Sequence, residues 1–265
     1  MIIDMLPVWV FFFIMVGLVL LSIEIGFRIG RAVRGKTDDE RESPASSISG
    51  VILGLQAFML AFTFSIVSDR YDTKKGLVRE EANTIRTAFH RADFLIEPDR
   101  AKTKAVLRDY VGQRIAVGLS HDAQFVYSSL GDALRMQQQL WDIAVANGRA
   151  DMNSDVGALY VESVNEIAHM HAMRVSIALQ ARIPTVIWVV LISLLILGMI
   201  GMGYHTAIAD SRRSRVAPIL AIAFSLVVAL IAAIDNPAGF LMPVSQQPLT
   251  NVLSEMDAAQ VESGP

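Results

Sequence analysis

The sequence predicts an all-α membrane protein with four transmembrane helices and a helical extramembrane bundle between the second and the third. Three observations predict this fold class. The 265 residues are 53% hydrophobic with a mean hydropathy of +0.44, and very apolar blocks alternate with charged ones. Four blocks are long enough to cross a hydrocarbon core of about 30 Å. Between the second and third blocks, apolar residues recur at helical rather than alternating spacing.

Composition and charge exclude several function classes. The net charge of −3 comes without a basic tract interleaved with aromatic residues, which argues against nucleic acid as a partner. The chain has no cysteine, so disulfides and thiolate metal sites are excluded. The first apolar block ends in Glu24 and Arg28 rather than a cleavage site, so we expect a retained membrane helix. Glu24 either pairs with Arg28, four residues further on the same helical face, or faces a water-filled cavity.

Residues 1–68 are predicted to hold the first two transmembrane helices and a basic connector. The first span is Pro7 to Phe27, with aromatic residues near its start where a membrane-interface belt would lie. Gly30 to Ile48 is expected to be a polar connector that ends in the loop-like SPASS. The second span, Val51 to Val67, meets no proline before Ala92, so we expect one helix to leave the membrane and continue into water.

Residues 69–183 are predicted to form the extramembrane helical bundle, continuing the second span. Pro98 separates the charged continuation of the second span from the helices that follow it. These predicted helices are Asp99 to Gly118, Ala123 to Asn147 and Ser154 to Ile183.

The sequence of the last helix indicates its N-cap and its core side chains, and it contains one pair of residues of a type that can bind metal. Ser154 or Asp155 is expected to cap its first turn. Glu166 and His169 form a Glu-x-x-His pair, but carboxylate metal sites in four-helix bundles use two copies, so no metal site is predicted and salt bridges are expected. The expected core side chains are Leu159, Val164, Ile167, Met170, Met173 and Ile177.

Residues 184–237 are predicted to hold the third span, Pro184 to Tyr204, and the fourth, Val216 to Ile234. Residues 238–265 form a tail in which apolar residues at helical spacing predict a short amphipathic helix after Pro248.

Lysine and arginine are concentrated in the two short connectors between spans and are absent from the N-terminal stub and the tail. The positive-inside rule therefore predicts that both termini and the helical domain are extracytoplasmic in a multi-pass cell-membrane protein.

Two faces of the second span are candidates for lining a pore. Gln56, Thr63 and Arg70 are seven residues apart and share one polar stripe. Gln56 and Thr63 either hydrogen-bond within the helix bundle or line the pore of an oligomer, where a ring of Arg70 would favour anions. Phe58 and Phe62 lie on another face and either pack against a helix or form a hydrophobic constriction.

Motifs of enzymes are missing from the sequence. It contains no phosphate-binding glycine loop, no Gly-x-Ser-x-Gly elbow and no His-Glu-x-x-His. We therefore predict that the protein is not an enzyme, with no catalytic residues and no cofactor.

Two segments, Leu60 to Leu95 with its EEAN element and Ala232 to Leu249 with its VSQQPL element, resemble the bacterial bestrophin-like membrane protein family, a domain of unknown function. The resemblance implies a bacterial inner-membrane protein related to bestrophins, which are oligomeric anion channels with four spans and a large helical domain per subunit. The acidic calcium-clasp sequence of bestrophins has no counterpart here, so calcium gating is not implied. In bestrophins the helical domain is cytosolic, opposite to the orientation that the charges predict.

Together these features predict a homo-oligomeric, anion-permeable membrane ion channel whose pore is lined by the second span. The expected partners are the lipid bilayer, further copies of the chain and small inorganic ions. The alternative is a non-conducting membrane sensor or scaffold whose helical bundle binds a partner.

Overall fold

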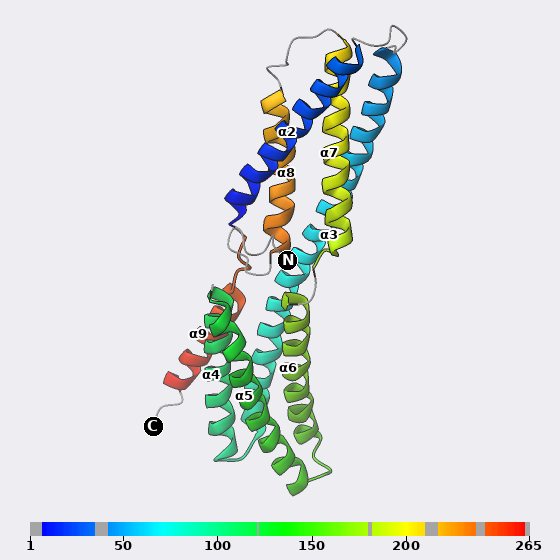
Figure 1. The fold of residues 1–265 in the computed structure, drawn as a ribbon. Coiled ribbons are helices and arrows are strands. Elements are labelled where there is room, and N and C mark those ends of the chain that lie inside the picture. The colour runs from blue at the N-terminus through cyan, green and yellow to red at the C-terminus, as the bar shows by residue number, and fades with distance from the viewer. Residues whose placement is uncertain are drawn as a thin grey trace. The chain divides into compact units, whose positions relative to one another are not determined.

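The computed structural model describes residues 7–34, 42–120, 122–179, 182–209, 217–236 and 242–262, and within them the chain is helical, without a strand. The chain divides into two compact units (Figure 1). Unit 1 comprises Met1–Asp69 and Arg182–Asn236, and unit 2 comprises Arg70–Ala181 and Pro237–Pro265. The α3 helix, Glu42–Arg91, contributes its first part to unit 1 and its second part to unit 2.

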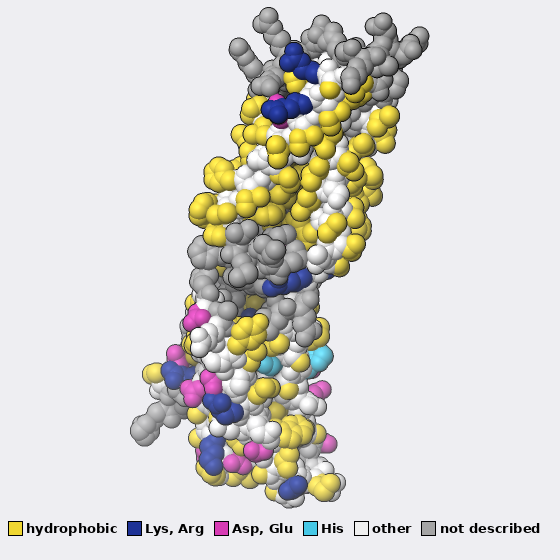
Figure 2. Space-filling view, viewed as in Figure 1, with side chains coloured by type: hydrophobic (Ala, Val, Ile, Leu, Met, Phe, Trp, Pro, Cys, Tyr) yellow, Lys and Arg dark blue, Asp and Glu magenta, His cyan; other side chains and the backbone are white. Residues whose placement is uncertain are grey.

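Unit 1 contains α2, Val8–Arg34, the first part of α3, α7, Thr185–Ile208, and α8, Ala217–Asp235. All four helices are long and apolar enough to cross a membrane, which confirms the predicted fold class of a four-span helical membrane protein. Hydrophobic side chains cover the visible face of these helices, whereas charged side chains are scattered over unit 2 (Figure 2). This contrast is expected when one unit faces lipid and the other faces water.

Close packing of α2 against α7 depends on glycine. A Cβ added at Gly203 would lie 2.1 Å from the carbonyl oxygen of Ile23, and one added at Gly26 would lie 2.0 Å from that of Ile200. Both contacts are with backbone, which cannot swing aside as a flexible side chain can. The two helices therefore approach more closely than any larger residue would permit, as small residues allow in membrane bundles.

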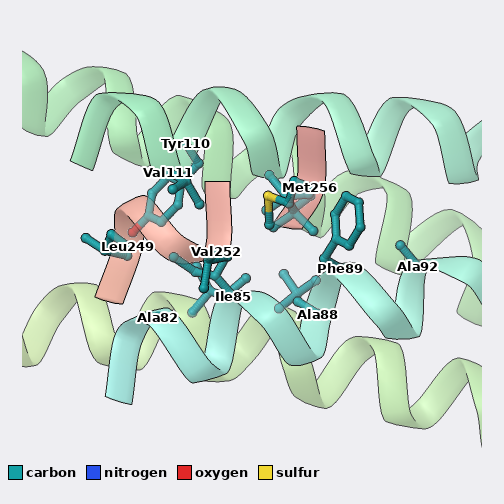
Figure 3. Packing of buried hydrophobic residues seen from close by; sticks show 14 of the residues in the cluster. Ala82, Ile85, Ala88, Phe89, Ala92, Tyr110, Val111, Leu249, Val252 and Met256 are labelled. Atoms are coloured by element: carbon teal, nitrogen blue, oxygen red, sulfur yellow. The ribbon is translucent and has the colours of Figure 1, made fainter. Parts of the chain in front are cut away.

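Unit 2 contains the second part of α3, a short 3-10 turn, α4, α5, α6 and α9. The bounds are Ala92–Phe94 for the turn, Asp99–Leu119 for α4, Ala123–Ala150 for α5, Asp155–Leu179 for α6 and Gln247–Glu262 for α9. The tail helix was predicted to be amphipathic, but not to join the bundle. Its Leu249, Val252 and Met256 are buried and pack among side chains of α3 and α4 (Figure 3).

The connector between the first two spans is shorter than predicted. The first helix continues past Phe27 to Arg34, and α3 begins at Glu42, so most of Gly30 to Ile48, including SPASS, is helical. Pro44 is tolerated because the first N–H groups of a helix have no partner within it. The rest of this connector, residues 35–41, lies outside the described residues, as do residues 210–216 of the second connector.

The core of α6 was predicted only in part. Val164, Ile167 and Met170 are buried, but Leu159 and Met173 are exposed by 40% and 39%, so their assignment to the core is wrong. The buried stripe instead passes through Tyr160, Val164, Ile167 and His171, and helical geometry places Leu159 and Met173 beside it rather than on it.

The predicted N-cap of α6 is confirmed. The Ser154 hydroxyl accepts a hydrogen bond from the Gly157 backbone N–H at 3.0 Å. This contact satisfies one of the first-turn donors that lack a partner within the helix.

Candidate functional site

One face of α3 in unit 1 is buried against the other spans. Gln56 and Thr63 have no exposed surface, and Ser49 is also buried. The Thr63 hydroxyl donates to the Met59 carbonyl at 2.7 Å, the local bond that threonine commonly makes within a membrane helix. Both polar atoms of the Gln56 amide are buried without a hydrogen-bond partner among the described residues. The predicted polar stripe therefore faces the interior of the unit.

The opposite face of α3 is apolar and exposed. Phe58 is 65% exposed and Phe62 is 55% exposed, and their rings stack with centroids 6.4 Å apart and an interplanar angle of 14°. Leu55 belongs to the same exposed surface. Because two residues correspond to about 200° of helical rotation, Phe58 points almost directly away from Gln56. The structure thus separates the two faces that the sequence proposed for a pore.

A strip of small residues adjoins the phenylalanine face. Gly50, Gly54, Ala57 and Ala61 are all exposed. An added Cβ at either glycine would meet nothing within 4 Å inside the chain. These positions follow spacings of three and four, so they form one smooth edge along which another helix could approach closely.

Polar residues continue the exposed face toward the end of unit 1. Ser65 and Asp69 are exposed and follow Phe58 and Phe62 on the same side of α3. Arg70, the next residue along the chain, is half-buried and lies on the side of the predicted polar stripe. The face that begins with aromatic rings therefore ends in a hydroxyl and a carboxylate.

Unit 2 holds a separate, buried ionic cluster. Glu81 of α3 has no exposed surface and accepts hydrogen bonds from two guanidinium groups. Arg114 of α4 donates through Nε to Glu81 Oε1 at 2.9 Å, and Arg174 of α6 donates through Nη1 to Glu81 Oε2. Arg174 also donates through Nη2 to the side-chain oxygen of Gln246 at 3.4 Å. The Glu81 carboxylate thus ties together three helices, and Arg174 links them to the segment before α9.

Neutral polar groups surround this cluster. The Tyr110 hydroxyl lies 3.5 Å from His171 Nδ1 and accepts a hydrogen bond from Gln137 at 3.3 Å. Burial, and then the charge of Glu81, raise the pKa of Tyr110 to about 12. Burial, and then the charge of Arg114, lower the pKa of His171 to about 4. Both side chains are therefore uncharged near neutral pH.

A family model described as a bestrophin-like domain matches residues 16–248. The chain belongs to the bestrophin-like family. This membership places it in a membrane family of channel type rather than a family of enzymes. It also confirms the family that the EEAN and VSQQPL elements indicated.

The bestrophin-like chain also resembles a solved crystal structure that is described as that of a membrane protein. The two are 14% identical, the match covers 97% of each chain, and the TM-score is 0.57. At this identity the likeness shows the fold alone. A search of curated proteins finds no match.

The two sequence elements that indicated the bestrophin-like family meet in the buried cluster of unit 2. EEAN supplies Glu81, VSQQPL supplies Gln246, and Arg174 donates to both. Arg114 and Arg174 are not among the residues predicted from the sequence. A signal was available, because Arg114 follows Leu107 and Val111 at helical spacing and so places a cation on an apolar face.

The remaining candidates in the bestrophin-like chain are surface groups. Glu166 and His169 are not buried on α6, and no group of residues in the described part of the chain could hold a metal. Glu162 accepts from Arg91 at 3.0 Å, which agrees with the expected salt bridges. Glu24 accepts from Arg28 at 2.8 Å, so the pairing alternative is confirmed for that residue.

Proposed function

We propose that this bestrophin-like protein is a homo-oligomeric ion channel whose pore is lined by α3, with Phe58 and Phe62 facing the axis. The exposed α3 face carries the proposal. Ser65 lies within the predicted span on this face, where a water-filled pore would hydrate its hydroxyl, and Asp69 follows at the end of the span. Burial of Gln56 and Thr63 inside one chain leaves them to support α3 rather than to line a pore between chains.

The small-residue strip supports assembly around α3. Helices in membranes associate through close van der Waals packing, and Gly50, Gly54, Ala57 and Ala61 offer an edge without protruding side chains. A neighbouring copy that packs on this edge would leave the adjacent phenylalanine face directed toward the shared axis.

Two stacked phenylalanines from each subunit would make a narrow apolar ring. Such a ring holds water weakly and can stop ions by dewetting, without any physical plug. We therefore assign the gate to Phe58 and Phe62.

The preference for anions or cations depends on which charged residue of α3 faces the pore at the end of the span. The expectation of anion permeability depends on Arg70 reaching the axis. On α3 it is Asp69 that continues the phenylalanine face, and a ring of carboxylates favours cations. We propose that the channel prefers cations at this end. The sign of the reversal potential in a salt gradient distinguishes a cation preference from an anion preference.

The decisive experiment is current recording from the purified protein in planar bilayers. Phe58→Ala and Phe62→Ala should each change conductance or open probability because they widen the ring. Phe13→Ala is the matched control, since Phe13 of α2 is also 65% exposed but does not lie on α3. Gln56→Leu should leave the current unchanged.

An oligomer that seals the bilayer and carries no current would contradict the proposal and favour the non-conducting sensor or scaffold. Equal effects of Phe13→Ala and Phe58→Ala would contradict the assignment of the pore face.

The proposed orientation, with unit 2 outside the cytoplasm, rests on the charges of the connectors. Ser254 is exposed on α9, and the chain has no natural cysteine, so Ser254→Cys provides a single labelling site. Modification in intact cells is expected. Modification only in broken cells would place unit 2 in the cytoplasm, as in bestrophins.

A further inference from the structure

The buried cluster of unit 2 carries more positive than negative charge. Arg114 is 5% exposed, the side chain of Arg174 is 14% exposed, and both guanidinium groups share the single carboxylate of Glu81. His171 adds no negative charge, and Tyr110 is un-ionised near neutral pH. The cluster therefore holds one net positive charge that is largely, though not wholly, shielded from bulk water.

No other carboxylate in the described part of unit 2 balances this charge, because Glu81 is the one buried acidic residue there. An uncompensated buried charge is costly, so a counter-ion here would be strongly favoured.

Arg114 has hydrogen-bond donors to offer to such a counter-ion. Its Nε bonds Glu81, and this is the one hydrogen bond that the Arg114 side chain makes within the described residues. The two terminal nitrogens carry four further N–H groups. Since a guanidinium presents these donors in a rigid plane, they define a place where an anion can accept two hydrogen bonds at once.

Close packing one helical turn beyond Arg114 favours a small ligand. A Cβ added at Gly118 would lie 2.4 Å from the side chain of Gln246, which shows how closely α4 and the segment before α9 approach in this region. A small inorganic anion fits this description better than an organic acid.

We propose that the cluster formed by Glu81, Arg114 and Arg174 binds one small monovalent anion, such as chloride, on the terminal nitrogens of Arg114. The anion neutralises the net charge and stabilises unit 2. This site is independent of the pore, because it is built from side chains of unit 2 alone.

The test compares chloride with gluconate, a much larger monovalent anion, at constant ionic strength. The thermal midpoint of the detergent-purified full-length protein should rise with chloride and saturate. Arg114→Gln should weaken half-saturation about tenfold or more, because it removes a charge-assisted contact. Arg108→Gln is the matched control, since Arg108 lies on the same helix but pairs with the exposed Asp257.

Anomalous scattering from bromide tests the site directly in the wild-type protein, whether or not Arg114→Gln folds. Crystals of the wild-type protein grown in bromide should show an anomalous peak beside the Arg114 terminal nitrogens. Absence of that peak would overturn the proposal, and so would equal midpoints in chloride and gluconate. In Phe58→Ala the thermal midpoint should still rise with chloride. Loss of that rise would place the anion in the pore and contradict the proposal.

Discussion

Substituting Glu81 by glutamine tests whether the buried cluster holds unit 2 together. Glutamine has nearly the same shape as glutamate, so Glu81→Gln changes charge without opening a cavity. The variant leaves Arg114 and Arg174 buried without an anionic partner. Removing one member of a buried ion pair costs about 3–5 kcal/mol, because the remaining charge loses its compensation. We expect Glu81→Gln to lower the free energy of unfolding of unit 2 by this amount.

Glu255→Gln provides the matched control. Glu255 of α9 also accepts two hydrogen bonds from one arginine, Arg86, at 2.7 and 3.0 Å, but its side chain is 53% exposed. Ion pairs that face water contribute about 0–1 kcal/mol. The two substitutions remove the same chemical group and differ in burial, so the predicted difference between them is at least about 2 kcal/mol.

The assay is a urea titration of the detergent-purified protein in gluconate buffer, followed by brief proteolysis and analysis of cleavage within unit 2. The urea midpoint should fall strongly for Glu81→Gln and little for Glu255→Gln. Equal shifts would refute the reasoning, because burial would then make no difference to the value of the carboxylate.

Three further predictions concern packing, pH and capping. Gly203→Ala should force α2 and α7 apart and lower the thermal midpoint, whereas Gly17→Ala, whose new Cβ meets nothing within 4 Å, should not. The pKa of His171 is lowered to about 4, so the unfolded chain binds a proton below pH 6.5 that the folded chain does not. Stability should therefore fall by about 1.4 kcal/mol per pH unit between about pH 6.5 and 4 through this group, and a series of unfolding titrations should show this slope missing in His171→Asn. Ser154→Ala should cost about 1 kcal/mol by the same assay, because it removes the cap of α6.

The spans and the long α3 helix could be predicted because their signals are local. Apolar runs set the length of each span, and the absence of proline after Val67 left α3 uninterrupted as far as Arg91. The ends of the helices were harder to predict. SPASS has the composition of a loop, but its proline lies in the first turn of α3, where proline is tolerated.

The candidate site could be predicted only as a pair of alternatives. Spacing identifies two faces of α3, but only packing shows that Gln56 is enclosed and Phe58 is not. The spacing of Arg114 on an apolar face indicates a buried cation, but its partners could not be predicted, since Glu81, Arg114 and Arg174 come from three different helices.

The position of α9 has a consequence for how the protein is made. Unit 2 consists of two stretches of chain, and the ribosome must produce α7 and α8 before it reaches the second. At about 5–20 residues per second, the surface that receives Leu249, Val252 and Met256 waits several seconds after α6 has emerged. During that time the bundle presents an open apolar groove. Slow insertion of the last two spans would lengthen this exposure, so the yield of folded protein should depend on membrane insertion even though the groove belongs to the unit outside the bilayer.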